Sequence, residues 1–325
     1  MPLTGGRLRV IMFGVNSPAP QPGLSTPDTA PPHTHLRSGS GGLLLSVAIV
    51  SWNTRQLLLD ALASIYDAPP PFGFEVIVVD NASADGSAAA VAERFPQVVL
   101  IANTENTGYA EGNNQAMKTA HSAYILLLNP DVLLPAGGLE HAAGFMEAHP
   151  DAGALGVRQV HPDGRLQRSV RGFPTPLTVL WELLGLSRFF PNSRLFGAYR
   201  MTWFDYAHVA EVDQPMGTFL LMRSAVVEQV GMLDEAFPIF FNEVDWCLRC
   251  KRAGWKIYFT PDVEIIHYGG ASTLQVGAAM AWESRRGLLQ FYAKHYPALR
   301  FWPLRALIAL ASWPHAWLQA RQRKK

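Results

Sequence analysis

The sequence predicts an α/β protein whose central, mostly parallel sheet is covered by helices on both faces. From residue 43 onward, short continuous apolar runs alternate with segments whose apolar residues recur at helical spacing. The apolar runs lack the alternation of a sheet with one solvated face, which is typical of parallel strands buried on both sides. Of the 325 residues, 49% are apolar and 16% are charged, so the chain can form a large buried core.

The first part of the chain reads as a regular series of strands and helices. Leu58, Leu62 and Ile65 give the first helix an apolar stripe, and Asp85, followed by Gly and Ser, is a typical helix start. This half ends near Val157. We expect strands at 43–52, 74–83, 97–103 and 123–132, and helices at 54–68, 85–95 and 110–120.

The pattern changes in the second part of the chain. Residues 160–212 are rich in aromatic residues and show no clear period. An apolar run follows at 216–227, and beyond it we expect a helix at 242–254, a pair of strands within 256–270 and a helix at 282–296. No internal repeat is evident, so we expect one α/β body with additions in its second half.

The two ends of the chain differ from this body. Residues 1–42 are rich in Pro, Gly, Ser and Thr, a composition that predicts a disordered leader. Residues 298–325 combine Trp302, Trp313 and Trp317 with Leu and Ile and end in a basic run. This tail predicts either a helix at a membrane interface or a helix packed on the body. The sequence contains no run of 18 apolar residues and no clear signal peptide.

Charge and cysteine content exclude some classes of function. The formal net charge is +1, which argues against a protein that binds nucleic acid by broad phosphate neutralisation. Cys247 and Cys250 form a single C-x-x-C pair, without the second ligand pair of a zinc site. We expect inert thiols in a helix of a cytoplasmic protein.

Polar residues follow two of the expected strands at the point where each ends. Asp80 closes the second strand, and Asn129 and Asp131 follow the fourth. Because ligands of open parallel sheets bind beyond the carboxyl ends of the strands, these side chains should share one rim of the sheet. The turn after the first strand has no G-x-G-x-x-G, and the chain has no Walker sequence. An NAD enzyme or a P-loop ATPase is therefore not expected.

Six segments, in this order, resemble the signature of family 2 glycosyltransferases, in the branch of bacterial rhamnosyltransferases that build surface polysaccharides. They read VAIVSWNTRQLLLDALASI, VIVVDNASADGS, NTENTGYAEGNNQA, YILLLNPDVLL, MGTFLLMRS and FFNEVDWCLRCKRAGWKIYFTPDVEIIHYGGAS. The resemblance implies a GT-A fold, an NDP-sugar donor, a divalent cation and inversion at the anomeric carbon. The body at 43–297 would then consist of a nucleotide-binding half, 43–157, and an acceptor and catalytic half, 158–297.

The resemblance also implies which residues bind the donor. Asp80 would accept a hydrogen bond from the nucleotide base; the alternative is an Asx-turn or helix cap before Ser83. Gly108 and Gly112 suit a close approach to the donor, or else a simple strand-to-helix turn. The other expected donor contacts are Ser51, Asn53, Asn106, Asn113 and Asn129.

For the cation, Asp131 matches the last carboxylate of the family's Asp-x-Asp motif, whose first position is Asn129 here. Mg²⁺ or Mn²⁺ keeps waters and takes phosphate oxygens as ligands, so one carboxylate suffices in principle. His267 follows an apolar strand and would complete the metal site; the alternative is a histidine satisfied in the core.

The acceptor hydroxyl must lose a proton as it attacks, and Glu243 and Asp245 are the candidate bases. Glu243 aligns with the aspartate of the family's Glu-Asp base motif, which reads Asn242-Glu243 in this chain. Residues two apart do not share a helix face. We expect Glu243 to be the base and Asp245 its support or replacement, with Arg249 as an ordinary helix partner of Asp245.

The sequence thus predicts an inverting, metal-assisted glycosyltransferase that moves a deoxyhexose, with dTDP-rhamnose favoured, to a cell-surface glycan or polyprenyl-linked acceptor. It is expected in the cytoplasm, with peripheral contact to the inner face of the membrane. Trp203, Phe204 and Tyr206 are expected to contact the acceptor, whereas Trp246 and Trp255 are expected to be buried. The alternatives are a noncatalytic relative that binds nucleotide sugars or glycans, and a sugar nucleotidyltransferase, whose usual Gly-rich basic loop is absent.

Overall fold

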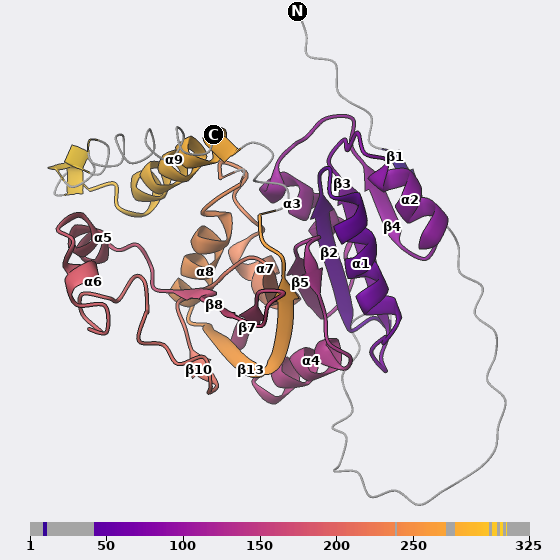
Figure 1. Ribbon diagram of the computed structural model, residues 1–325, viewed down its shortest axis with the longest axis horizontal. Helices are drawn as coiled ribbons and strands as arrows, with labels where there is room; N and C mark the ends of the chain where they lie inside the picture. Colours follow the sequence, from indigo (N-terminus) through magenta and orange to yellow (C-terminus); the bar gives the residue numbers. More distant parts are fainter. Residues whose placement is uncertain are drawn as a thin grey trace, which may run out of the picture.

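The computed structural model describes residues 9–11, 42–237, 239–270, 277–298, 301–303, 306–307 and 310. Most of the predicted leader and tail lies outside these residues. Within the leader, the structure describes only the short strand β1 (Arg9–Ile11), which pairs antiparallel with β4, and Gly42. The described strands form one large sheet with helices on both of its faces and a small two-stranded sheet beside it (Figure 1).

The first half of the sheet is parallel, as predicted. Its strands lie in the order β4-β3-β2-β5, and the register places Ser51, the last residue of β2, beside Asp80, the last residue of β3. The elements are β2 (Leu45–Ser51), α1 (Arg55–Tyr66), β3 (Phe74–Asp80), α2 (Ser87–Arg94), β4 (Val99–Ala102), α3 (Tyr109–Thr119) and β5 (Tyr124–Leu128).

The second half of the sheet is mixed. Strand β12 (Phe219–Arg223) lies antiparallel between β5 and β7 (Ala152–Val160), and β13 (Lys256–His267) then runs parallel to β7. Because β12 runs against β5, its first residue lies at the rim where β5 ends. The shorter strands are β6 (Val132–Leu133), β8 (Leu166–Gln167), β9 (Val170–Arg171), β10 (Ala210–Glu211) and β11 (Gln214–Pro215).

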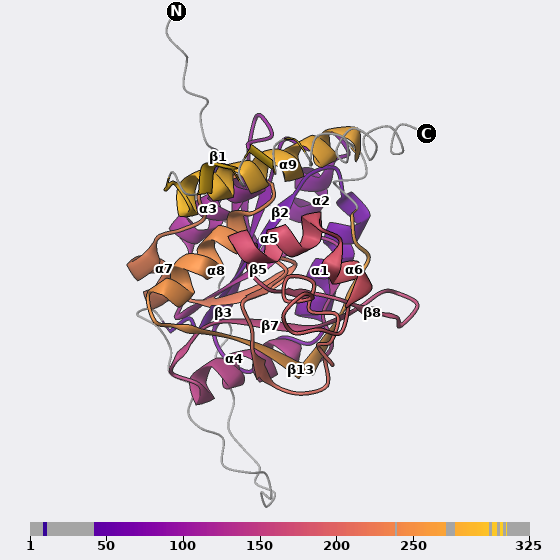
Figure 2. The ribbon, with the colours of Figure 1, turned by 90° about the vertical axis from the view of Figure 1, so that its left-hand side faces the viewer.

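The helices cover both faces of the sheet. Helices α1, α2 and α4 (Gly138–Ala148) pack on one face, and α3, α7 (Ser224–Val230), α8 (Asn242–Arg252) and α9 (Gly277–His295) lie on the other (Figures 1 and 2). Two short helices, α5 (Pro176–Leu183) and α6 (Leu186–Phe189), project from the aromatic-rich segment. No described helix is both long enough and apolar enough to cross a bilayer.

One sequence-based expectation for the second half was wrong, and one helix of the first half was not predicted. The expected pair of strands in 256–270 is the single strand β13, which passes Pro261 through a shift of register between Thr260 and Glu264. A proline at a bulge does not interrupt a strand, because the bulge leaves its missing N–H outside the ladder. Helix α4 lies outside every predicted helix.

The aromatic residues of the segment before β10 pack against the core, and one of them is fully buried. Tyr206 is only 1% exposed, and its ring packs edge-on against Phe204 and Phe259 at centroid distances of 4.8 and 5.4 Å. Its hydroxyl accepts a hydrogen bond from the Val170 N–H. Trp203 and Phe204 are partly buried against the same core. Tyr206 therefore fixes the segment to the sheet, which corrects the expectation that it binds the acceptor; for the partly exposed Trp203 and Phe204 that role stays a prediction.

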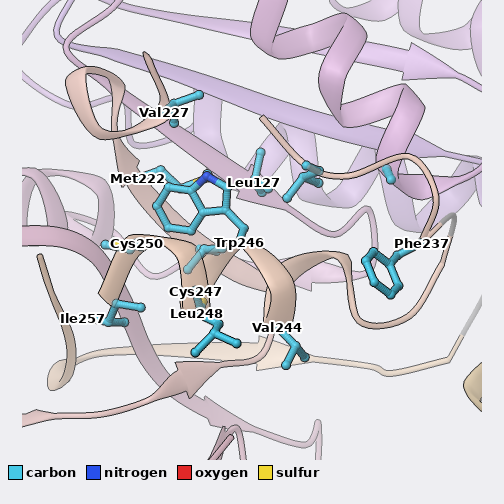
Figure 3. Packing of buried hydrophobic residues seen from close by; sticks show 14 of the residues in the cluster. Leu127, Met222, Val227, Phe237, Val244, Trp246, Cys247, Leu248, Cys250 and Ile257 are labelled. Atoms are coloured by element: carbon cyan, nitrogen blue, oxygen red, sulfur yellow. The ribbon is translucent and has the colours of Figure 1, made fainter. Parts of the chain in front are cut away.

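Helix α8 is held firmly against the sheet. Trp246 is fully buried among Met222, Leu127 and Val227, and its indole N–H donates to the Gly231 carbonyl (Figure 3). The thiols of α8 are free and buried, and burial raises the pKa of Cys250 to about 12. The apolar side of α8 is thus a rigid support for the polar residues at its first turn.

Candidate active site

The carboxyl ends of β2, β3 and β5 meet at one rim of the sheet. Strand β2 lies between β3 and β5, so Asp80 and the Asn129–Asp131 segment stand on either side of Ser51. Two strand spacings separate them by roughly 10 Å. Asp80 and Asp131 are 3% and 4% exposed, so two buried carboxylates face the same rim. This confirms the shared rim that the strand ends predicted.

One carboxylate oxygen of Asp80 accepts a hydrogen bond within the protein, and the other has no partner. Its Oδ2 accepts a hydrogen bond from the Ser83 N–H at 3.0 Å, which is the predicted Asx-turn. Its Oδ1 is buried and has no hydrogen-bond partner. A buried carboxylate oxygen without a partner is costly unless a ligand or water donates to it. The turn and the binding role are therefore compatible in the same side chain.

Ser51 and Asn53 lie at the end of β2 and in the turn that follows it. The Ser51 and Thr54 hydroxyls lie 2.9 Å apart. Asn53 adopts the left-handed conformation, with φ 52°, and its amide oxygen accepts a hydrogen bond from the Ala84 N–H. The Asn53 N–H donates to the Ser83 hydroxyl. These bonds tie the turn after β2 to the turn after β3.

The start of α3 presents a second buried acceptor. Asn113 is 1% exposed; its amide nitrogen donates to the Tyr109 carbonyl, and its Oδ1 has no partner. Asn106 is exposed, and its side chain accepts from the Gly108 N–H, which shapes the turn in which Gly108 has φ 89°.

The close approach at Gly112 is between helix α3 and the sheet. A Cβ there would lie 2.9 Å from Val50 Cγ1, so this glycine lets α3 pack directly on β2.

The expected metal ligands face each other. Strand β13 pairs antiparallel with β6, so His267 lies opposite Val132 and next to Asp131. His267 Nε2 lies 3.4 Å from Asp131 Oδ1. That nitrogen is buried and has no hydrogen-bond partner, while Nδ1 bonds to Gln167. Asn129 is half-buried beside this pair and donates its backbone N–H to the Thr218 carbonyl.

This pair fits a divalent cation that takes few protein ligands. The described part of the chain contains no group of three His, Cys, Asp or Glu residues that could hold a metal. Mg²⁺ and Mn²⁺ sites need only one or two side chains when phosphate oxygens and waters complete the shell. The orphaned Nε2 of His267 and the buried carboxylate of Asp131 supply two such ligands.

Glu243 stands in the first turn of α8, at the same rim. A Cβ on Gly217, the residue two before β12, would lie 3.5 Å from the Glu243 side chain and 3.6 Å from the Tyr109 hydroxyl. Burial raises the pKa of Glu243 to about 7, against the opposing effect of the backbone N–H groups of Glu243 and Val244. A carboxyl with a pKa near neutrality is suited to general base catalysis.

Tyr109 links the base candidate to the metal ligands. Its hydroxyl donates to the Gly217 carbonyl at 2.9 Å. Burial raises the pKa of Tyr109, and so do the negative charges of Glu243 and Asp131. The negative charges of both carboxylates thus act in the same direction on the pKa of this one hydroxyl.

Asp245 lies in a different environment from Glu243. Its fully buried carboxylate pairs with Arg249 at 2.8 Å and with Lys294 and His295 of α9 at 2.7 Å. Burial alone would raise the pKa of Asp245, but these hydrogen bonds and charges outweigh it and lower the pKa to about 2. A carboxylate held by Arg249, Lys294 and His295 is a poor base, so its contacts fit the support role and not the replacement role.

Three residues at the site were not predicted from the sequence. Tyr109 lies inside the N-x-G segment that was singled out, and Gly217 opens the apolar run before β12, so both had a local signal. Gln167 is in the aperiodic segment and carried no signal. Its role depends on contacts with residues 100 positions away.

The comparisons with known proteins agree with this geometry. The model for glycosyl transferase family 2 matches residues 46–209. N-acetylglucosaminyl-diphospho-decaprenol L-rhamnosyltransferase of Mycobacterium tuberculosis is 28% identical over 253 residues, which is 73% of this chain and 81% of that protein. Rhamnosyltransferase WbbL of Escherichia coli is 25% identical over 171 residues, 50% of this chain and 61% of that protein.

Solved structures share the fold at lower identity. The mannosyltransferase PcManGT from Pyrobaculum calidifontis, in complex with GDP-Man and Mn²⁺, superposes with a TM-score of 0.53 at 21% identity, over 86% of this chain and 73% of that one. Residues 1–349 of TarS from S. aureus give a TM-score of 0.50 at 16% identity, over 84% and 81% of the two chains. Both likenesses support the predicted GT-A fold.

Proposed function

The chain belongs to glycosyl transferase family 2 and is a glycosyltransferase with a GT-A fold, and from this premise we propose that it transfers a deoxyhexose with inversion from an NDP-sugar to a lipid-linked glycan. The observation that carries the proposal is the placement of Glu243. This carboxyl, with its pKa raised to about 7, shares a rim with the Asp131–His267 pair and with the open oxygen of Asp80. These groups would serve as the base, the diphosphate site and the nucleotide site of the reaction.

In the proposed reaction, Glu243 removes the proton from the acceptor hydroxyl. The hydroxyl oxygen attacks the anomeric carbon from the face opposite the diphosphate, and the new C–O bond forms as the bond to the phosphate oxygen breaks. The nucleoside diphosphate leaves with the bonding pair, and the proton stays on Glu243 until solvent takes it. A carboxyl with a pKa near 7 is largely ionised at slightly alkaline pH and still basic enough to accept the proton.

The remaining residues would hold the donor. Asp80 Oδ1 and Asn113 Oδ1 are buried acceptors without partners, and they would accept hydrogen bonds from the base and sugar of the nucleotide. Asp131 and His267 would hold Mg²⁺ or Mn²⁺, which, when bound, offsets the charge of the departing diphosphate. Gly217 leaves space between Glu243 and Tyr109, where the acceptor hydroxyl would reach the base.

The relatives support a choice of substrates. Two of the similar proteins are named as rhamnosyltransferases, and one of them as acting on N-acetylglucosaminyl-diphospho-decaprenol. We therefore propose dTDP-rhamnose as donor and an N-acetylglucosaminyl-diphospho-polyprenol as acceptor. Such an acceptor is anchored in a membrane, so the proposal includes peripheral contact with the inner face of the cell membrane.

The test is a transfer assay on the purified full-length protein. A panel of dTDP-, UDP- and GDP-sugars is first screened for a rise in melting temperature with Mn²⁺. Donors that stabilise the protein are then incubated with N-acetylglucosaminyl-diphospho-polyprenol, and the product is analysed for mass and anomeric configuration. We expect transfer of rhamnose with inversion.

Other outcomes separate the alternatives. Stabilisation by a nucleotide sugar without hydrolysis or transfer would identify a noncatalytic binder. Release of pyrophosphate from dTTP and a sugar phosphate would identify a nucleotidyltransferase. Transfer of a sugar other than rhamnose would support the proposed reaction and contradict the proposed donor.

The membrane contact has its own test. Full-length protein and a variant truncated before Phe301 are sedimented with vesicles that contain anionic lipid. We expect only the full-length protein to sediment, because the tail carries tryptophans and a basic end. Equal sedimentation of both forms would show that the tail is not the anchor.

A further inference from the structure

Gln167, in the two-residue strand β8, makes three hydrogen bonds around the proposed metal ligand His267. Its Oε1 lies 2.7 Å from His267 Nδ1, and its Nε2 lies 3.0 Å from the His267 carbonyl oxygen and 2.8 Å from His161 Nδ1. Strand β8 pairs with β7, and β7 pairs with β13, so the sheet brings Gln167 and His267 to the same face. One side chain thus contacts both the imidazole and the backbone of His267.

These bonds fix the orientation of the amide of Gln167. The His267 carbonyl oxygen can only accept a hydrogen bond, so the atom of Gln167 that faces it must be the NH₂ group. Both N–H donors of that group are then engaged, one by the carbonyl and one by His161. The oxygen of the amide is therefore the atom that faces His267 Nδ1, and it can only accept.

The tautomer of His267 follows from this orientation. Since Gln167 Oε1 accepts, Nδ1 of His267 carries a hydrogen. In a neutral imidazole, Nε2 then has its lone pair free. Nε2 is the buried nitrogen that has no hydrogen-bond partner and lies 3.4 Å from Asp131 Oδ1. The lone pair is thereby directed toward the carboxylate with which it would share a cation.

We propose that Gln167 is a positioning residue that presents His267 to the divalent cation, by holding its imidazole as the Nδ1–H tautomer and fixing its ring plane. The inference rests on the proposed function, because it assumes that Asp131 and His267 bind the cation. Gln167 itself does not touch the substrate. Outer partners of metal-binding histidines act in this way, and their loss typically costs roughly 10–100-fold in metal affinity.

The test compares two substitutions at position 167 in the full-length protein. Gln167→Leu removes every hydrogen bond to His267 at similar volume. Gln167→Glu retains an oxygen that can accept from Nδ1–H. We measure Mn²⁺ binding, without nucleotide, from the electron paramagnetic resonance signal of free Mn²⁺. We expect Gln167→Leu to lose roughly 10–100-fold in affinity and Gln167→Glu to retain most of it.

A second readout reports the tautomer directly. Nitrogen-15 NMR of the histidine side chains in the metal-free protein distinguishes an Nδ1–H from an Nε2–H imidazole, with His267→Gln used to assign the signal. We expect the Nδ1–H form in the wild type and in Gln167→Glu, and a mixture in Gln167→Leu. A residue that only supported the fold would leave this signal unchanged.

Gln159 provides the matched control. It lies directly opposite Gln167 in the β7–β8 register, is fully buried, and has no hydrogen-bond partner at either amide atom. Gln159→Leu should leave Mn²⁺ affinity and the His267 signal unchanged. Equal Mn²⁺ affinity in Gln167→Leu and the wild type, or equal losses in the Leu and Glu variants, would overturn the inference. If the wild type itself does not bind Mn²⁺, the proposed metal site fails, which is a separate result.

Discussion

The two carboxyl groups in the first turn of α8, those of Glu243 and Asp245, have opposite environments. Glu243 faces the rim of the sheet beside Gly217 and has a raised pKa. Asp245 faces α9, pairs with Arg249, Lys294 and His295, and has a lowered pKa. The same chemical group thus has a raised pKa on one side of a helix and a lowered pKa on the other. What differs is whether cations are available to neutralise it.

The sharpest test of this contrast is Glu243→Gln, which keeps the shape of the side chain and removes the base. We expect transfer to fall by about 10²–10⁴-fold, while donor binding changes little. Turnover at a saturating donor concentration and donor affinity by calorimetry measure the two effects. Glu228→Gln, at an exposed position of α7, is the matched control and should retain full activity. Near-normal turnover of Glu243→Gln would remove Glu243 from the mechanism.

On the other side of the turn, Asp245→Asn should lower the stability of the folded protein. Removing one partner of a buried ion-pair network leaves the others without their counter-charge, so we expect a loss of about 3–5 kcal/mol in the free energy of unfolding. Urea denaturation measures it. Asp163→Asn, which breaks the exposed pair with Arg165, should leave the free energy of unfolding almost unchanged. A loss of the same small size for Asp245→Asn would mean that α9 does not depend on this carboxylate.

The pH dependence should also separate the two carboxyls. Glu243 must be ionised to act as a base, so kcat/KM should rise with pH and level off above about 7. Because its folded-state pKa is raised from 4.5, the folded state holds an extra proton between these values, and stability falls as pH rises through that window. Glu243→Gln should therefore raise the melting temperature at pH 8 and leave it unchanged at pH 4.

The pKa shift of Asp245, and therefore its effect on stability with pH, has the opposite sign. Its pKa is lowered in the folded state, so its contribution to stability is present above about pH 4 and is lost as pH falls toward 2. Melting curves of the wild type and Asp245→Asn should converge in acid. Curves that stay parallel down to pH 2 would show that the ion pairs are not the source of the difference.

The smallest expected effect concerns Gln159, whose buried amide has no partner. Gln159→Leu replaces this polar group by an apolar one of similar size, and should stabilise the protein by roughly 1–3 kcal/mol without loss of transfer. Thermal unfolding and the transfer assay measure both. A rise in the donor KM would instead indicate that this amide binds substrate.

The parallel half of the fold and its rim could be predicted because their signals are local. Continuous apolar runs mark where β3 and β5 end, and parallel strands place their ends on one side, so Asp80 and Asp131 were found together. Position alone did not predict which oxygen of Asp80 stays open. That depends on the turn in which Ser83 engages the other oxygen.

The second half was less predictable because its contacts join distant parts of the chain. Local spacing identified Arg249 as a partner of Asp245, but Lys294 and His295 come from α9, about 50 residues away. The ordinary helix pair expected from spacing is therefore one part of a larger buried network. Gln167 lay in a segment without periodicity, and its contacts with His267 arise only because β8 and β13 both pair with β7.

One feature of the α8–α9 contact connects the two sides of the turn. Phe241, directly before α8, adopts a left-handed backbone with φ 72°, which is strained for a bulky residue. Gly287 of α9 leaves the space for its ring, since a Cβ there would lie 2.8 Å from Phe241 Cδ2. A methyl group added at position 287 would have to displace this ring, which belongs to the residue directly before the first turn of α8. The single hydrogen atom of this glycine on α9 thus leaves the space that the entry to α8 occupies, so the two helices can pack in this way only with glycine at position 287.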